Sequence, residues 1–364
     1  MKIKKNMIYV IAEIGVNHNG SVKTAMKLIR EAKICGANAV KFQKFIPELM
    51  ILEKTKKASY QRKLSNSNES QFEMLKKYQL KDKDYLDLHG YCRKKRIDFI
   101  CTPFELVSLN FLLKKLKLSM IKISSTDLTN VPMLIEVGRS NCKVILSTGM
   151  STLPEIDIAL SALAFGNLKL KNKFSLLQQS KYLNRAKNYL KNKVTLMHCT
   201  SAYPAPPNEL NLNAIDVLKK RYKTSIGYSD HSNSLITSSI VAAKNISCVE
   251  VHVTLNNKLN GPDHASSLNI LKFKKYVDLI RQTETMMGRH QKYITKSEFN
   301  TKKFAQKSLV ISSNIMKNDK ISQENLSIKR PGTGISPIHY FDFIGKKVKI
   351  NLKKNTLMSK KFLK

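Results

Sequence analysis

The feature of the chain that most constrains its fold is a pattern repeated over residues 7 to about 290. In each repeat a short β-rich run ends in polar residues, and an amphipathic helical stretch follows. The first run is Ile8–Ala12, and the helix near Val22–Cys35 places its apolar residues on one face. The other runs are Asn38–Phe42, Asp98–Thr102, Met120–Ser124, Lys143–Ser147, Val194–His198, Thr224–Tyr228 and Cys248–His252. Eight β/α units over this length predict an α/β TIM barrel.

Polar side chains stand at the C-terminal ends of the predicted strands. They are Glu13, Lys41, Gln43, Thr102, Lys122, Ser125, Ser147, Tyr203, Ser229, His231, Glu250 and His252. Enzymes with this fold carry their chemistry at that end of the barrel. Polar residues at eight consecutive strand ends are not expected by chance, so the pattern predicts an active site.

Two histidines stand in short polar contexts, His231 directly after Asp230 and His252 two residues after Glu250. Imidazoles beside carboxylates are suited to binding a divalent metal. In a strand, the spacing of two residues puts Glu250 and His252 on the same face. The alternative is a pair of core histidines that only bond the backbone.

The formal net charge is +38, which by itself would favour nucleic acid as a partner. The lysines, however, are spread along the whole chain, often beside Asn and Ile, as expected from codon bias in an AT-rich genome. We therefore expect no nucleic-acid function, although the field would attract a substrate carrying phosphate and carboxylate.

Several features bear on the compartment. No apolar run reaches 18 residues, so no membrane span is expected. The basic start Met1–Lys5 leads into a predicted first strand rather than a signal peptide, and we expect a cytoplasmic protein. The cysteines lie scattered in apolar segments, with no Cys-x-x-Cys pair, and buried free thiols are predicted.

Two stretches depart from the repeated pattern. Residues 166–193 are rich in Lys and Asn and contain no acid, and we interpret them as a solvated insertion, partly helical at Leu176–Leu190. Residues 305–364 lose the β/α rhythm and predict a small β-rich domain. The predicted organisation is a barrel over 1–292, a linker over 293–304 and the small domain over 305–364.

Ten segments, taken together, resemble the bacterial sialic acid synthases. This N-acetylneuraminate synthase family also makes legionaminic and pseudaminic acids. The segments are Ala12–Gly20, Val40–Gln43, Thr102–Phe104, Ile121–Ser125, Ser147–Met150, His198–Pro204, Gly227–His231, Glu250–His252, Gly261–His264 and Lys329–Gly334. Any one of them is weak evidence, but ten in the same order span almost the full length.

The resemblance implies a TIM barrel followed by an antifreeze-like SAF domain with a β-clip fold. It also implies a domain-swapped homodimer in which the small domain of one subunit caps the barrel of its partner. The implied reaction condenses phosphoenolpyruvate and water with N-acetylmannosamine, giving N-acetylneuraminate and phosphate. A legionaminic or pseudaminic acid synthase, which uses a diacetamido-trideoxy hexose, is the alternative.

The resemblance also implies roles for individual residues. His231 and His252 would bind Mn²⁺, with Mg²⁺ as a substitute. Phosphoenolpyruvate would be held by Lys41, Thr102, Lys122, Ser125, Ser147, Ser201 and Ser229. The sugar would be bound by Glu13, Gln43, Tyr203 and Asp263, and its N-acetyl group by Arg330 of the partner subunit. Glu250 would stabilise positive charge at C2 of the enol or orient the attacking water.

One departure from the family pattern is Val251, where the family usually has lysine between the glutamate and the histidine. Val251 is expected to face away from the metal, so we interpret the change as one of packing. Two other functions stay open. A phosphoenolpyruvate aldol-type synthase that makes a 3-deoxy-sugar phosphate would need further basic groups for its sugar phosphate. A non-catalytic sugar- or nucleic-acid-binding barrel would not need the intact set His231, His252, Lys41, Lys122 and Glu250.

Overall fold

A computed structural model describes residues 7–57 and 69–364, so the basic segment Met1–Lys5 lies outside the described residues. The chain divides into two compact units, one ending at Gly288 and the other running from Arg289 to Lys364. Each unit has its own buried apolar core. No helix in the described ranges is long and apolar enough to cross a membrane.

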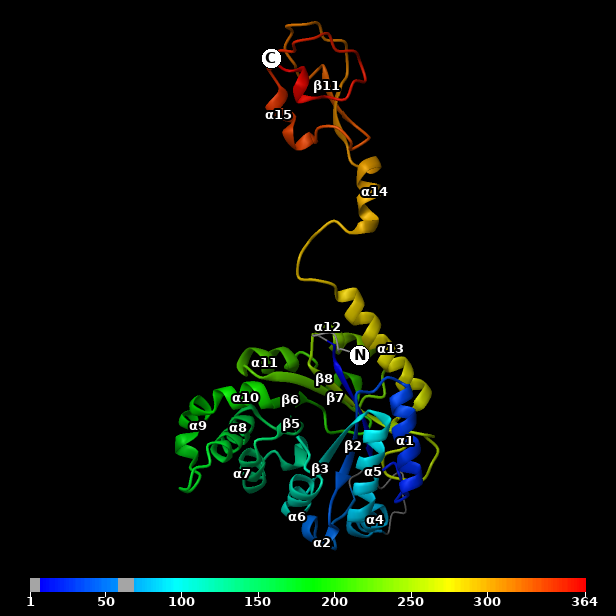
Figure 1. Cartoon of the computed structure of the whole chain (residues 1–364), viewed down its shortest axis with the longest axis vertical. Coiled ribbons are helices and arrows are strands. Elements are labelled where there is room, and N and C mark those ends of the chain that lie inside the picture. The colour runs from blue at the N-terminus through cyan, green and yellow to red at the C-terminus, as the bar shows by residue number, and fades with distance from the viewer. Residues whose placement is uncertain (1–6, 58–68) are drawn as a thin grey trace. The chain divides into compact units, whose positions relative to one another are not determined.

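The first unit is a nearly closed barrel of eight parallel strands surrounded by helices (Figure 1). The strands are β1 Tyr9–Gly15, β2 Ala39–Lys44, β3 Asp98–Pro103, β4 Met120–Ile123, β5 Lys143–Ser147, β6 Val194–His198, β7 Ser225–Asp230 and β8 Cys248–Thr254. Their order is β3-β2-β1-β8-β7-β6-β5-β4, and a short strand β9, Leu268–Asn269, pairs with β8. In the described chain no hydrogen-bonded ladder joins β3 to β4. All eight predicted strands are present, and the predicted barrel is confirmed.

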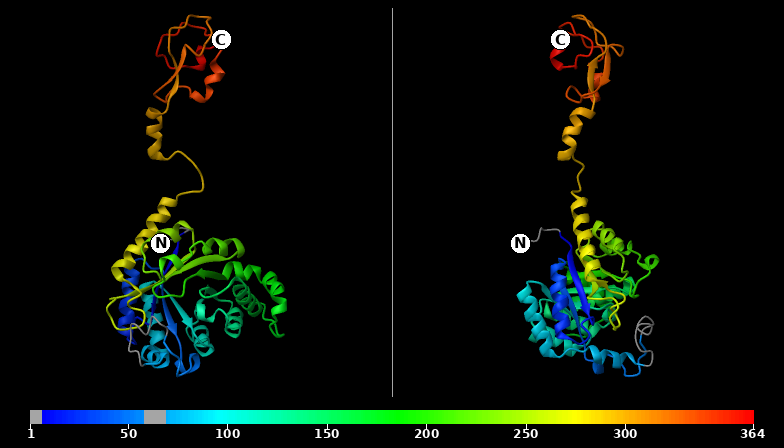
Figure 2. Two further views of the ribbon diagram at one scale, coloured as in Figure 1. Left: turned by 180° about the vertical axis from the view of Figure 1, so that it is seen from behind. Right: turned by 90° about the vertical axis from the view of Figure 1, so that its right-hand side faces the viewer.

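Helices follow the strands around the outside of the barrel, as the three views show (Figures 1 and 2). They are α1 Val22–Ile34, α2 Pro47–Met50, α4 Gln71–Tyr78, α5 Asp82–Lys95, α6 Leu106–Asn110, α7 Val131–Ser140, α8 Leu153–Asn167, α9 Gln179–Arg185, α10 Lys187–Lys193, α11 Ala214–Arg221, α12 Ile236–Ala243 and α13 Ile270–Met287. A π-helix spans Phe111–Lys115, and 3₁₀ turns span Ser125–Asp127, Leu176–Gln178 and Pro207–Glu209. Ser21 caps α1 by accepting from the Thr24 N–H, and Ser70 with Glu73 forms a capping box at α4.

The alternation of side chains along the strands positions the site. Apolar residues fill the lower part of the barrel interior, and they are Ile11, Ala39, Ile100, Ile145, Met197 and Cys248. On five of these strands the residue two positions later is polar and lies in the upper interior, namely Glu13, Lys41, Thr102, Ser147 and Glu250. Because the side-chain period of a strand is two, one face carries both the apolar plug and the polar layer above it.

The basic segment 166–193 is more integrated than its composition predicts. It contains α9 and α10, and it buries Tyr182, Ala186 and Tyr189 against the barrel core. The predicted helical content near Leu176–Leu190 is confirmed, but the segment is not solvated throughout, because aromatic residues among the lysines anchor it. α10 ends where β6 begins, at the end of the barrel opposite to the strand tips.

The second unit is small and partly β. Strands β10 (Ser308–Ile311) and β11 (Leu326–Lys329) pair antiparallel, and isolated bridges such as Ile315–Leu352 extend the pairing. Helix α15 spans Tyr340–Phe343, and 3₁₀ turns span Pro337–His339 and Lys360–Phe362. The predicted linker 293–304 contains most of a helix, α14 (Lys296–Ala305), begun by the capping box of Thr295 and Glu298.

Candidate active site

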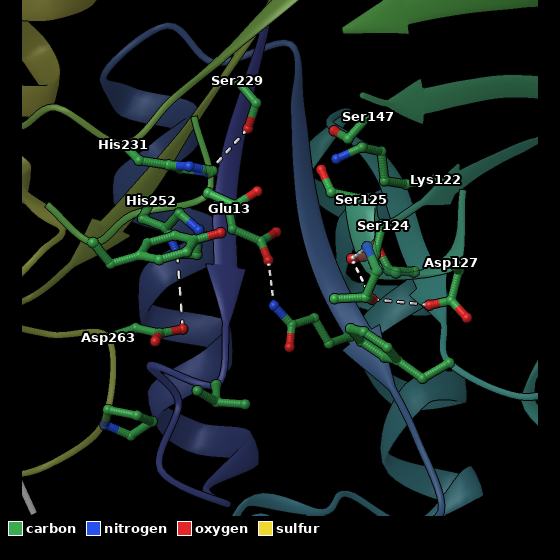
Figure 3. A pocket seen from close by; sticks show the side chains of 18 of the residues that line it. Glu13, Lys122, Ser124, Ser125, Asp127, Ser147, Ser229, His231, His252 and Asp263 are labelled. Atoms are coloured by element: carbon green, nitrogen blue, oxygen red, sulfur yellow. Dashed lines mark hydrogen bonds and ion pairs between the residues drawn. The ribbon is translucent and has the colours of Figure 1, made fainter. Parts of the chain in front are cut away.

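A cavity of about 550 Å³ opens at the C-terminal ends of the barrel strands. It is lined by every site residue predicted on the barrel, namely Glu13, Lys41, Gln43, Thr102, Lys122, Ser125, Ser147, Ser201, Tyr203, Ser229, His231, Glu250, His252 and Asp263. Figure 3 shows the side chains converging from both sides of this space. The strand-end rule therefore located the cavity correctly.

At the base of the cavity is a buried cluster of charges. The Lys122 ammonium lies 3.0 Å from both carboxylate oxygens of Glu250. Lys41 lies 2.9 Å from Glu13 and 3.7 Å from Glu250, and it donates to Thr102 at 3.3 Å. These charged side chains are all 5% exposed or less. Two cations and two carboxylates are thus held together out of bulk water.

The neighbours of each carboxyl group set its protonation. Burial alone would raise the pKa of Glu250, but the charges of Lys122 and Lys41 outweigh it and hold the pKa at about 2. Burial raises the pKa of Glu13, and Lys41 offsets this only in part. The pKa of Lys41 is raised because Glu13 and Glu250 outweigh the effect of burial. Glu250 therefore stays ionised near pH 7.

The two predicted metal ligands lie side by side, with ring centroids 5.5 Å apart. Burial, together with the other imidazole, lowers the pKa of His231 to about 4, and burial with the charge of Lys41 lowers that of His252 to about 3. Both rings are therefore neutral near pH 7. A neutral imidazole has a lone pair available for a metal.

The hydrogen bonds leave nitrogen lone pairs facing the cavity. Nδ1 of His231 donates to the Thr200 carbonyl at 2.7 Å, so its Nε2 carries the lone pair. That Nε2 lies 3.2 Å from the Ser229 hydroxyl, whose proton also lies within reach of Glu250 at 3.1 Å. One serine proton can satisfy only one of these acceptors. Nδ1 of His252 is buried and has no hydrogen-bond partner among the described residues.

This arrangement fits a metal with two protein ligands. Among the residues described, no group of three or more His, Cys, Asp or Glu side chains is placed to hold an ion. The two imidazoles would therefore need oxygen atoms of water or substrate to complete the coordination. Asp263 Oδ2 lies 3.9 Å from His252 Nδ1, too far for a hydrogen bond, and burial raises the pKa of Asp263 to about 7.

A group of small polar residues forms another part of the lining. The Ser125 hydroxyl accepts from the Gly149 N–H at 3.1 Å and lies 3.2 Å from the Cys199 thiol. A Cβ at Gly149 would lie 2.3 Å from the Ser201 hydroxyl and 2.8 Å from the Cys199 sulfur. Only glycine therefore lets these side chains approach so closely.

Several lining residues were missed by the sequence reasoning. The polar ones are Ser124, Thr126, Asp127 and Cys199, together with Gln71 on α4. Asp127 lies across the cavity from His231 and His252 (Figure 3), and it accepts from Asn130 and Thr126 at 3.1 Å. Its position two residues after Ser125 was the available signal. Gln71 had none, since it lies outside the strand ends.

Two residues singled out from the sequence, Arg330 and Val251, lie outside the cavity lining. Arg330 belongs to the second unit, is exposed and donates from Nε to the Ala305 carbonyl at 3.0 Å, so the cavity lining of the barrel does not include it. Val251 is 3% exposed and packs in the main core, on the face of β8 opposite to Glu250 and His252. The expected outward orientation of Val251 is confirmed.

The fold and the site define a TIM barrel whose cavity holds two buried lysines paired with carboxylates, beside two neutral imidazoles, at the end where barrel enzymes carry their chemistry. The predicted buried, free cysteines are confirmed for all six.

Comparison with known proteins assigns the family. The chain belongs to the NeuB family, which it matches over residues 28–292, and residues 306–364 match the SAF domain. It is 40% identical to the N,N'-diacetyllegionaminic acid synthase of Campylobacter jejuni over 98% of this chain and 99% of that protein. It is 32% identical to the enzyme of the same name from Legionella pneumophila, over 96% of this chain and 93% of the other.

A solved structure of a related protein supports the same family. The N-acetylneuraminic acid synthetase of Leptospira borgpetersenii, in complex with citrate, superposes with a TM-score of 0.65 and is 29% identical, covering 81% of this chain and 90% of its own. The predicted family, its SAF domain and its transferase class are confirmed.

Proposed function

We propose that this protein condenses phosphoenolpyruvate with 2,4-diacetamido-2,4,6-trideoxymannose, giving N,N'-diacetyllegionaminic acid and phosphate. The full-length relatives with the names given above support this acceptor over N-acetylmannosamine, the sugar first expected from the sequence. The observation that carries the chemistry is the buried Lys41–Glu250–Lys122 cluster beside His231 and His252.

Phosphoenolpyruvate would occupy the charged base of the cavity. Lys41 and Lys122 supply positive charge for its phosphate and carboxylate, and Ser125, Ser147 and Ser201 supply hydroxyl groups. The pKa of about 2 keeps Glu250 anionic beside these cations, so a negative charge stays close to C2. That charge stabilises the cation that develops at C2 when the enol reacts.

A divalent metal, Mn²⁺ or Mg²⁺, would be held by His231 and His252, and when bound it supplies Lewis-acid polarisation of the sugar aldehyde. Both imidazoles are neutral and present nitrogen atoms to the cavity, as such a site requires. Glu13, held by Gln43 at 2.8 Å, and Tyr203, whose ring lies 4.2 Å from that of His231, would orient the sugar.

The bonds balance without an oxidant or reductant. C3 of the enol attacks the aldehyde carbon, forming a C–C bond, and the aldehyde oxygen takes up a proton to become a hydroxyl. Water adds to C2 and loses a proton. The C2–O bond to phosphate then breaks while the C2 hydroxyl gives up its proton, which the leaving phosphate takes up, so C2 becomes a ketone that closes to the cyclic sugar acid.

The assembly and the compartment are part of the same proposal. A domain-swapped homodimer would bring Arg330 of one subunit to the sugar in the barrel of the other, since Arg330 stands on a separate unit. The six free thiols suit a reducing compartment, and we assign the protein to the cytoplasm, where phosphoenolpyruvate is made.

The test uses purified, metal-stripped protein with phosphoenolpyruvate and either diacetamido-trideoxymannose or N-acetylmannosamine, with and without Mn²⁺. Phosphate release and product mass are measured. Release that needs the metal and is fastest with the diacetamido sugar is the expected result. If folded protein releases no phosphate with either sugar, the proposal is refuted.

A further inference from the structure

An apolar wall lines part of the same cavity as the charged cluster. We define the mouth wall as the apolar lining residues Val16, Met50, Ile51, Met74, Leu75 and Phe104. They belong to a hydrophobic cluster separate from the main barrel core. Met74 is 1% exposed and Leu75 8% exposed, and both are presented by α4. Phosphoenolpyruvate is small and highly charged, so its binding does not require such a wall.

The mouth wall lies further out along the barrel than the reacting groups. Val16 comes three residues after Glu13, and Phe104 two residues after Thr102. Both residues stand just past the ends of their strands, β1 at Gly15 and β3 at Pro103, so they lie nearer the mouth than Glu13 and Thr102. A sugar whose C1 lies at the two histidines therefore has its far carbons, C4 to C6, toward the wall.

We propose that the mouth wall is the specificity determinant of the enzyme. It receives the C6 methyl group and the methyl group of the 4-acetamido substituent of the acceptor sugar. This inference rests on the proposed function and names the part of the site that selects its substrate. The six side chains of the wall offer contact area to methyl groups and carry no hydroxyl, amide or charged group; the amide of Gln71, one turn earlier on α4, stands beside them in the cavity lining.

The physical reason is the difference between the two sugars at their far ends. N-acetylmannosamine carries hydroxyl groups at C4 and C6, which would lose water against Met74 and Leu75 without gaining a hydrogen bond from either of these side chains. The diacetamido-trideoxy sugar buries methyl groups there instead. Apolar pockets discriminate modestly in such cases, so we expect a preference of about 100-fold in kcat/KM.

Two variants test the proposal, Met74→Gln and Leu75→Gln, each of which keeps the side-chain size and adds an amide. The ratio of kcat/KM for the two sugars is measured, because a partly unfolded preparation lowers both values and leaves the ratio unchanged. We expect the ratio to fall at least about tenfold, since the amide can bond a hydroxyl and disfavours a methyl group. Met133→Gln, in the core of α7 and away from the cavity, is the matched control and keeps the wild-type ratio.

The outcomes separate this inference from the proposed function. If both wall variants turn over both sugars with the wild-type ratio, the mouth wall does not select the substrate, while the proposed reaction stands. If the wild-type protein uses neither sugar, or prefers N-acetylmannosamine, the proposed acceptor is wrong and the inference falls with it.

Discussion

His18 shows how a single buried side chain couples the barrel to pH. Burial lowers its pKa to about 4, against about 6.5 in an unfolded chain. Between these values the unfolded chain binds a proton that the folded chain does not, so stability is complete above pH 6.5 and is lost as the pH falls toward 4. The loss approaches about 1.4 kcal/mol per pH unit for this group.

His18→Gln should therefore flatten part of the acid dependence. The free energy of unfolding, measured by urea titration from pH 7 to pH 4.5, should fall less steeply in the variant than in the wild type. If the free energy of unfolding falls equally steeply with pH in His18→Gln and in the wild type, His18 is not a source of the acid dependence.

Two buried tyrosines form a matched pair. The hydroxyl of Tyr276 donates to the buried carboxylate of Asp230 at 2.8 Å, whereas that of Tyr182 has no hydrogen-bond partner among the described residues. Tyr276→Phe should lower the free energy of unfolding by about 1.5–3 kcal/mol, and Tyr182→Phe should leave it unchanged or raise it slightly. Chemical denaturation decides, and equal losses in both variants would show that the hydroxyl of Tyr182 is satisfied.

Strand β8 shows how side-chain alternation along a whole element divides residues between the cavity and the core. Glu250 and His252 face the cavity and Val251 faces the core, as the period of two requires. Val251→Lys, which restores the residue usual in the family, should change the turnover of folded protein less than about twofold while lowering stability by about 1–3 kcal/mol. Steady-state kinetics with a thermal melt measures both. A large gain in turnover would mean that position 251 acts on the chemistry.

The elements differ in how well they could be predicted from the sequence. The strands and their polar tips were predictable because apolar runs with a polar end have a local signature, and they gave Glu13, Lys41 and the two histidines. Met74 and Leu75 were not, because their place over the mouth depends on how α4 packs across the barrel. Tyr182 was missed for a similar reason, since lysine-rich composition concealed an aromatic anchor.

For the whole molecule the question is whether the second unit of one chain completes the barrel site of another. Glu250→Gln and Arg330→Ala should each strongly reduce turnover, the first by removing the charge at C2 and the second by removing a sugar contact. In a domain-swapped homodimer, a mixed dimer has one intact barrel served by an intact Arg330. Mixing the two variants should then restore about one quarter of the wild-type activity, because half of the dimers are mixed and half of their sites are intact. Activity that stays at the level of the separate variants would mean that each chain completes its own site.

The central claim is that C3 of phosphoenolpyruvate attacks the sugar and water enters at C2. The most direct measurement is mass spectrometry of both products formed in water enriched in heavy oxygen. Our account predicts heavy oxygen at C2 of the sugar acid, read from a fragment before solvent exchange, and none in the released phosphate. Heavy oxygen in the phosphate would mean that the P–O bond breaks, and it would contradict the account.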